Sequence, residues 1–212
     1  MTALAWVALA VAALAAVTDW IAVARDDRHL EHLAKPVVLV AAIGLALAVT
    51  PADPSLRWPV VAGLVFGLVG DVLLMLDRFV PGALAFAVGH VCYLVAFVPL
   101  AHPPVALAAA ALLGLLLLAV PGPRVVRGAM GRSRVLGGVV VVYEVLLAGV
   151  VVAGAGTGNA VLATGVVLFA ASDLLNGWRR FVGSPPGGRV VVHATYHVGQ
   201  VLIALSLITL GG

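Results

Sequence analysis

Charged residues are scarce in this sequence. Only 10% of the 212 residues are Asp, Glu, Lys or Arg, 63% are hydrophobic, and the mean hydropathy is +1.19. Because soluble domains carry about 25% charged residues, this composition excludes an ordinary soluble fold. The chain is predicted to be a multi-pass protein of the cell membrane.

Cysteine is nearly absent as well. Cys92 is the only one, which excludes an intramolecular disulfide and a metal site built from cysteines alone. The sequence also lacks a basic patch, since the net charge of +3 comes from residues spread over short loops. This distribution argues against a nucleic-acid partner and favours membrane lipids with anionic headgroups.

Linkers and polar domains are missing, because long apolar runs follow one another closely. The runs lie at 2–24, 35–50, 58–77, 80–101, 104–120, 134–153, 159–175 and 190–210. A helix needs about 20 residues to cross the hydrocarbon of a bilayer. We therefore predict an all-α fold, a bundle of eight transmembrane helices in the single domain 1–212. The short runs 35–50 and 104–120 would need tilt or local thinning of the bilayer.

The basic residues predict the orientation of these helices. All of them except Arg57 flank odd-numbered loops. By the positive-inside rule the odd loops are cytoplasmic and both termini lie outside. No basic segment precedes the first run, and Asp19 and Trp20 occupy the place of a cleavage region. The first run is therefore expected to remain as a helix and not to be removed as a signal peptide.

Ionisable and strongly polar residues interrupt the apolar runs. A charge in hydrocarbon costs about 3 kcal/mol or more, so such residues mark a functional site by default. Counting about 1.5 Å per residue from the loops puts nearly all of them in the cytoplasmic half of the membrane. They are Asp19, Lys35, Asp71, His90, Tyr93, Glu144, Ser172, Asp173, His193, Tyr196, His197 and Gln200. The active-site face is therefore predicted to be cytoplasmic.

Structural explanations compete with functional ones for several of these residues. Asp71 could pair with Lys35 and so fix two helices to each other. Asp173 could cap a helix end, and His90 could be a hydrogen-bonded packing residue. Asp19 is expected at the membrane interface, where its carboxylate would be hydrated.

The last run carries a polar stripe. Its members occupy positions i, i+3, i+4 and i+7 of one helix face: His193, Tyr196, His197 and Gln200. Two histidines at i and i+4 can bind one metal ion from a single helix. The motif is short, and a structural or headgroup-facing stripe is the favoured interpretation.

The two halves of the chain show a weak similarity. Residues 70–74 resemble 172–175, and residues 90–93 resemble 197–200. The matching segments are four helices apart and so would share one membrane orientation, as in a parallel repeat. Two parallel four-helix repeats are one interpretation, and chance matches in so biased a composition are the other.

Short motifs on five of the runs occur in a fixed order. They are Lys35-Pro36, Gly70-Asp71, Phe79-x-x-Gly82-x-x-x-Phe86-x-x-x-His90-x-x-Tyr93-x-x-x-Phe97, Phe169-x-x-Ser172-Asp173 and Tyr196-x-x-x-Gln200-x-Leu202-Ile203-x-x-Ser206. Together they resemble the YhhN/lysoplasmalogenase-like family of integral membrane proteins, and the resemblance covers nearly the whole chain. Asp19, Glu144, His193 and His197 have no counterpart in the family pattern.

The resemblance implies an eight-helix membrane hydrolase that cleaves the vinyl ether bond of lysoplasmalogens, a class of lysophospholipids, and releases a fatty aldehyde. It also implies that no cofactor or metal is required. Hydrolysis of a vinyl ether begins with proton transfer to carbon, and water then captures the oxocarbenium ion. The reaction needs an acid, an anion and a positioned water.

Two buried carboxylates can divide these roles when one is kept protonated and the other ionised, as in glycosidases. Asp71 and Asp173 are the predicted catalytic pair, with the deeper Asp71 as the better candidate for the acid, and His90 is the third predicted catalytic residue. The predicted binding residues are Lys35 for the phosphate and, around the water and the glycerol oxygens, Tyr93, Ser172, Tyr196 and Gln200.

Two other classes of function remain open at this stage. One is a zinc-dependent, ceramidase-like membrane hydrolase that uses His90, His193 and His197 with a metal-activated water. The other is a small membrane transporter, although polar residues are few in the outer half of the membrane. The physiological lipid and the oligomeric state are not determined by the sequence.

Overall fold

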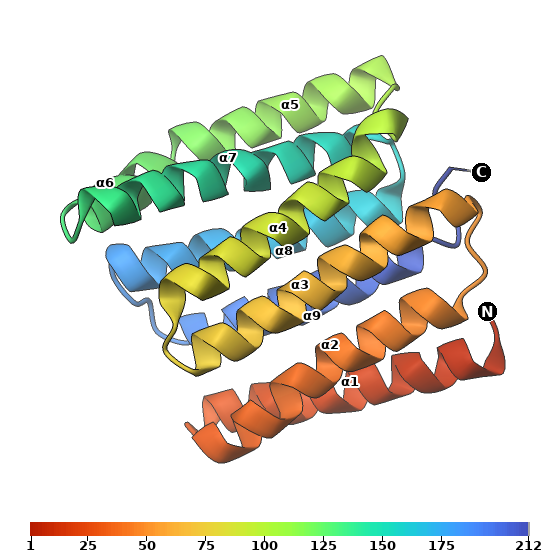
Figure 1. The fold of residues 1–212 in the computed structure, drawn as a ribbon, viewed down its shortest axis with the longest axis horizontal. Coiled ribbons are helices and arrows are strands. Elements are labelled where there is room, and N and C mark those ends of the chain that lie inside the picture. The colour runs from red at the N-terminus through yellow and green to blue at the C-terminus, as the bar shows by residue number, and fades with distance from the viewer. Residues whose placement is uncertain (212) are drawn as a thin grey trace.

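The fold is a bundle of roughly parallel and antiparallel helices (Figure 1), seen in a computed structural model that describes residues 1–211. Within this range the α-helices are α1 (Ala3–Ala24), α2 (Arg28–Ala48), α3 (Arg57–Met75), α4 (Phe79–Phe97), α5 (Pro104–Ala119), α6 (Gly122–Met130), α7 (Arg134–Gly156), α8 (Ala160–Phe181) and α9 (Gly188–Ser206). Two 3₁₀ turns, Pro54–Leu56 and Val98–Leu100, precede α3 and follow α4. The all-α prediction is confirmed.

Every predicted run forms a helix, and local capping explains where the bounds differ. The helix predicted at 35–50 starts at Arg28, because the Asp27 side chain accepts a hydrogen bond from the backbone N–H of Leu30. Proline at position 36 is accommodated inside α2. The short helix α6 was not predicted. It follows α5 closely and lies beyond the end of the predicted run 104–120.

Seven segments of the described chain are long and apolar enough to span a membrane. They comprise α1 to α4, the combined α5–α6 segment, α7 and α8. The chain is therefore a multi-pass membrane protein. The last helix, α9, carries Arg189, two histidines and Gln200, and an eighth span remains a prediction.

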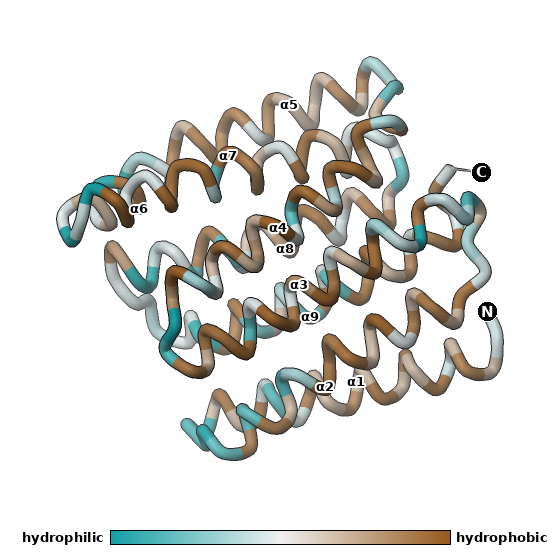
Figure 2. The backbone as a smooth tube through the Cα atoms, viewed as in Figure 1, coloured by the Kyte–Doolittle hydropathy of each residue, from teal (hydrophilic) through white to brown (hydrophobic). Residues whose placement is uncertain are grey.

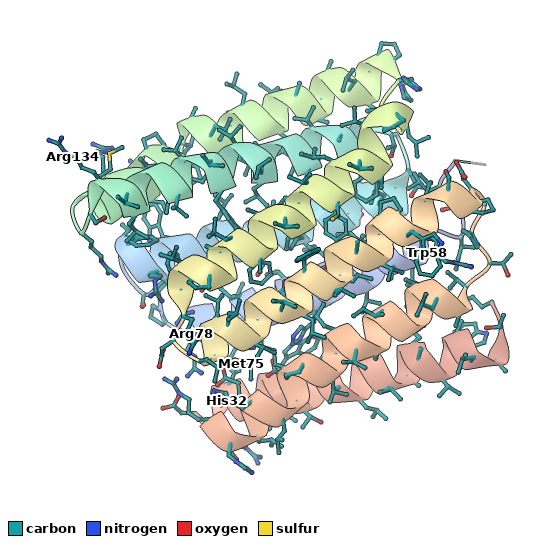
Figure 3. All side chains as sticks on the ribbon, viewed as in Figure 1. His32, Trp58, Met75, Arg78 and Arg134 are labelled. Carbon is teal, nitrogen blue, oxygen red and sulfur yellow. The ribbon has the colours of Figure 1, made fainter. Side chains whose placement is uncertain are left out.

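Polar residues gather at the helix ends, most densely where α1 joins α2, α3 joins α4 and α6 joins α7 (Figure 2). His32, Arg78 and Arg134 lie at this end of the bundle and Trp58 lies at the other (Figure 3). The odd-numbered loops that carry the basic residues therefore share one face. Its assignment to the cytoplasm remains a prediction from the positive-inside rule.

The helices pack as antiparallel neighbours: α1 with α2, α3 with α4, and α8 with α9, while α7 contacts α4, α5 and α8. Phe97, Phe169 and Ile203 are among the large side chains that are completely enclosed. The outer faces are apolar, with Leu14 and Val135 among the exposed residues. A surface of this kind suits surrounding lipid and would be a liability in water.

The two strongest candidates for a repeat, α3–α4 and α8–α9, face each other in the middle of the bundle. The Tyr93 hydroxyl on α4 donates a 2.6 Å hydrogen bond to Gln200 Oε1 on α9. This hydrogen bond joins the two helix pairs. The sequence duplication itself remains a prediction.

The contact between α8 and α9 depends on two glycines that bring the helix backbones together. A Cβ on Gly199 would lie 2.8 Å from the backbone N of Phe169 and 2.9 Å from the carbonyl O of Gly165. Both distances are shorter than packed atoms tolerate, and the obstructing atoms are backbone. Small residues of this kind let membrane helices approach closely.

We predict that Gly199→Ala lowers the free energy of unfolding by about 1–3 kcal/mol, the usual cost of overpacking. The measurement is thermal unfolding of the purified protein in detergent. Gly138→Ala is the matched control, since no heavy atom of residues 1–211 lies within 4 Å of a Cβ at that position. Equal unfolding midpoints for both variants would contradict the close-contact explanation.

Candidate active site

An open cavity of about 810 Å³, including the space at its mouth, lies among the polar residues of the bundle. Helices α2, α3, α4, α6, α7, α8 and α9 all contribute to its wall. The polar lining residues are Lys35, Asp71, Tyr143, Glu144, Ser172, Asp173, Asn176, His193 and Tyr196. Most of the remaining wall is aliphatic or aromatic. The cavity therefore offers charged and hydrogen-bonding groups within an apolar enclosure.

Asp71 and Lys35 form an ion pair that joins α2 to α3. Lys35 Nζ lies 2.8 Å from Asp71 Oδ1, and the Asp71 side chain is 2% exposed. Lys35 is the only lysine of the sequence, and its ammonium also lies 5.7 Å from the ring centroid of Tyr196. The pairing considered as a structural explanation for Asp71 is thus present, and it lies on the cavity wall.

Two polar atoms beside this ion pair remain unpaired. Asp71 Oδ2 and the Tyr196 hydroxyl are buried and have no hydrogen-bond partner within residues 1–211. A buried polar group without a partner costs about 1–3 kcal/mol, so native proteins rarely leave one unless a ligand or water binds there. Because both residues line the cavity, a bound molecule can satisfy them.

Asp173, Tyr143 and His90 form a second group, contributed by α8, α7 and α4. The Tyr143 hydroxyl donates a hydrogen bond to Asp173 Oδ2, and His90 Nε2 lies 3.6 Å from the same oxygen. The His90 ring meets the Tyr143 ring edge-on at 4.9 Å and stacks on Phe169 at 5.2 Å. His90 is thus held beside the carboxylate, although it does not line the cavity itself.

Tyr143 was not among the predicted site residues. It is the only hydroxyl-bearing side chain within a valine-rich stretch of α7, a signal that the sequence analysis did not use. Its neighbour Glu144 was among the polar residues predicted in the cytoplasmic half of the membrane. Glu144 Oε2 lies near Gly122 at the start of α6, and it lines the cavity.

Three of the predicted binding residues serve helix packing. Tyr93 and Gln200 bond to each other and are not part of the cavity wall. The Ser172 hydroxyl does line the cavity, but it donates a 3.0 Å hydrogen bond to the Val192 carbonyl and so ties α8 to α9. The structure therefore brings Lys35, Ser172 and Tyr196 to the cavity and leaves Tyr93 and Gln200 outside it.

Asp19, predicted at the interface, is instead completely buried. Its Oδ2 lies 2.7 Å from His193 Nδ1 and 3.8 Å from His197 Nδ1. The indole N–H of Trp20 donates to His197 Nδ1 at 3.2 Å. Asp19 is buried because α1 packs against α9, a contact that its sequence position alone does not reveal.

The histidines therefore divide into two groups. Asp19, His193 and His197 bring one ligand atom each within 4.8 Å of one another, which is close enough for a metal ion. The proposed zinc set of His90, His193 and His197 was wrong, because His90 belongs to the Asp173 group. Of the three histidines, only His193 and His197, at positions i and i+4 of α9, lie in one cluster.

A chain of charged contacts links His193 to the surface. Arg189 bonds to Asp26 and to Glu31, both at 2.5 Å, and Glu31 Oε1 lies 3.7 Å from His193 Nε2. Glu31 and Arg189 were not predicted site residues. Their separation in sequence, with |i−j| of 158, explains why local patterns gave no indication of this contact.

The fold and the cavity thus define a multi-pass membrane protein with two carboxylates, Asp71 and Asp173, on the wall of one internal cavity. The chain belongs to the YhhN family, whose sequence profile matches residues 30–207. The family resemblance inferred from the motifs is confirmed.

Two curated relatives are both described as lysoplasmalogenase TMEM86B. The protein of Sus scrofa is 34% identical over 145 residues, which cover 66% of this chain and 58% of the relative. The protein of Homo sapiens is 34% identical over 148 residues, which cover 68% and 60%. The chain thus spans about three fifths of the length of these relatives. No solved structure matches the chain.

We predict that Lys35→Met destabilises the protein by about 3–5 kcal/mol, because it leaves a buried carboxylate without its counter-ion. The double variant Lys35→Met/Asp71→Asn removes both charges and should recover much of this loss. Denaturant unfolding of the wild type, both single variants and the double variant gives the coupling energy. Additive effects would contradict a direct ion pair.

Proposed function

We propose that the protein is a membrane lipid hydrolase that cleaves the vinyl ether bond of lysoplasmalogen-like lysophospholipids. The observation that carries this proposal is the presence of Asp71 and Asp173 on the wall of one cavity, each with different partners. The relationship to lysoplasmalogenases supports the same reaction class. Vinyl ether hydrolysis needs an acid and an anion close together, and this pair can supply both.

The partners of Asp71 and Asp173 favour acid and base roles opposite to those expected from the depth of each residue in the membrane. Asp71 lies 2.8 Å from an ammonium group, which stabilises its ionised form. Asp173 accepts a hydrogen bond from the neutral Tyr143 hydroxyl, and no Lys or Arg nitrogen of the described chain lies within 4.0 Å of it. On these partners, we assign the role of acid to Asp173 and the role of base to Asp71.

The proposed reaction starts with transfer of a proton from Asp173 to the outer vinyl carbon of the substrate. The resulting oxocarbenium ion lies near the Asp71 carboxylate, which stabilises its positive charge. Asp71 takes a proton from water as the water oxygen bonds to the carbon that bears the ether oxygen. The hemiacetal then collapses: Asp71 returns its proton to the departing glycerol oxygen and Asp173 recovers one from the hemiacetal hydroxyl.

The attacking water has a natural position in this scheme. Asp71 Oδ2 is an unpaired acceptor and the Tyr196 hydroxyl an unpaired donor on the same cavity wall. A buried water needs two to four polar partners, and these two atoms can supply them. In this proposal Lys35 pairs with Asp71, whereas the sequence interpretation assigned Lys35 to the phosphate group of the substrate.

We predict that Asp71→Asn and Asp173→Asn each lower the turnover rate by about 100-fold or more, the usual contribution of a general acid or base. The assay measures aldehyde release from a lysoplasmalogen per mole of folded protein, at a temperature at which every variant is folded, because Asp71→Asn also breaks the ion pair with Lys35. Asp53→Asn is the matched control, because Asp53 belongs to a loop outside the cavity. Activity above a tenth of the wild type in both cavity variants would rule out the carboxylate pair.

The Asp19–His193–His197 cluster favours a second candidate, a zinc-dependent lipid hydrolase. Incubation of the purified protein with a panel of lysolipids, with and without a chelator, separates the two candidates. We expect aldehyde release that is insensitive to the chelator. Release of fatty acid that the chelator abolishes, together with zinc in the purified protein, would instead support the metal enzyme.

A further inference from the structure

An apolar groove of about 530 Å³ lies between α4 and α7, next to the cavity. Small residues form it: Ala83 and Ala87 on α4, and Gly138 on α7. Leu84 and Val142 lie at its outer side and are 53% and 59% exposed. Because both helices are candidate membrane spans, the groove opens toward lipid hydrocarbon.

The groove and the cavity share part of their walls. Ala83, Val139 and Tyr143 line both of them. On the groove side the lining is apolar apart from the Tyr143 hydroxyl, which is turned to Asp173. On the cavity side the wall carries the carboxylates and Lys35. Tyr143 therefore stands at the junction of an apolar and a polar compartment.

We propose that this groove binds the hydrocarbon chain of the substrate and admits it from the bilayer, laterally between α4 and α7. The inference rests on the proposed function and assigns the position of the tail. In a vinyl ether lipid the reacting bond begins the hydrocarbon chain, where the chain meets the glycerol. The catalytic groups must therefore lie where a polar compartment meets an apolar one.

The position of the groove along the helices suits a lipid that enters from one leaflet. Gly138 is one turn from the start of α7 at Arg134, and Ala83 is one turn from the start of α4 at Phe79. Arg78 and Arg134 mark this end of the bundle (Figure 3). A single hydrocarbon chain can thus lie in the groove while its headgroup stays near the polar end of the helices.

Glycine at position 138 provides the means to close the groove without disturbing the fold. Apart from the neighbouring backbone of α7 itself, nothing in residues 1–211 lies within 4 Å of a Cβ at this position, and the residue is exposed. Gly138→Phe therefore adds a ring to empty space on the groove wall. Ala87→Leu narrows the groove from the opposite helix. Val145→Phe, on an exposed position of α7 outside both the groove and the cavity, is the matched control.

The experiment measures kcat/KM of each variant, reconstituted in lipid nanodiscs, for a hexadecenyl and a hexenyl lysoplasmalogen. We expect Gly138→Phe to lower the value for the long chain by at least about tenfold, because the displaced methylenes lose their burial. Ala87→Leu should act in the same direction. The value for the short chain should change by less than about twofold in both variants, and Val145→Phe should match the wild type.

If kcat/KM for the long-chain substrate is unchanged in both groove variants, the inference is overturned. The groove would then contact bilayer lipid and not the substrate. Equal losses for both chain lengths would also overturn the inference, since they would indicate a disturbed catalytic centre. In either case an active wild type keeps the proposed function intact. If the wild type hydrolyses neither substrate, this result contradicts both the proposed function and the inference that rests on it.

Discussion

A charge within a membrane-spanning bundle must find its counter-charge inside the protein, and the rest of this structure depends on that constraint. The only lysine, Lys35, pairs with Asp71 and thereby fixes α2 to α3. Asp19 Oδ2 lies 2.7 Å from His193 Nδ1, and this contact joins α1 to α9. A buried pair contributes little net stability over apolar packing, yet breaking it is costly. Such pairs therefore specify which helices are neighbours. The apolar side chains around them can pack against many different partners and so do not specify neighbours.

The polar groups that the fold does not satisfy are as informative as those it does. Asp71 Oδ2 and the Tyr196 hydroxyl are enclosed and unpaired among the described residues, although the hydrogen-bonded Tyr93–Gln200 pair shows that the bundle can satisfy buried polar side chains nearby. Unpaired donors and acceptors on a cavity wall are prepared for a molecule that supplies the missing partners. This is the arrangement that a hydrolase requires, because its water must be held before it reacts.

The proposed hydrolysis at the head of a hydrocarbon chain imposes a second requirement, a site that is polar on one side and apolar on the other. The cavity and the groove between α4 and α7 provide the two environments, and Tyr143 borders both. The same residue orients Asp173 through its hydroxyl. Helix packing, the hydrogen bond to Asp173 and the proposed access to lipid thus all involve Tyr143.

The sequence by itself determined the elements of this protein and its family. Apolar runs of membrane-spanning length predict each long helix, because burying backbone polar groups in hydrocarbon leaves few alternatives to a helix. Motifs such as Phe169-x-x-Ser172-Asp173 carry enough information to identify the family. The Lys35–Asp71 pair could also be anticipated, since a lone buried cation needs an anion.

Only the tertiary structure decided which polar residues share a site. It moved Asp19 from the interface to the interior, separated His90 from His193 and His197, and placed Tyr143 beside Asp173. These relations depend on how each helix is rotated about its axis and which helix lies beside it. Helical periodicity gives the faces of one helix, but the choice of neighbour comes from packing among helices that are all apolar, and no local pattern encodes it.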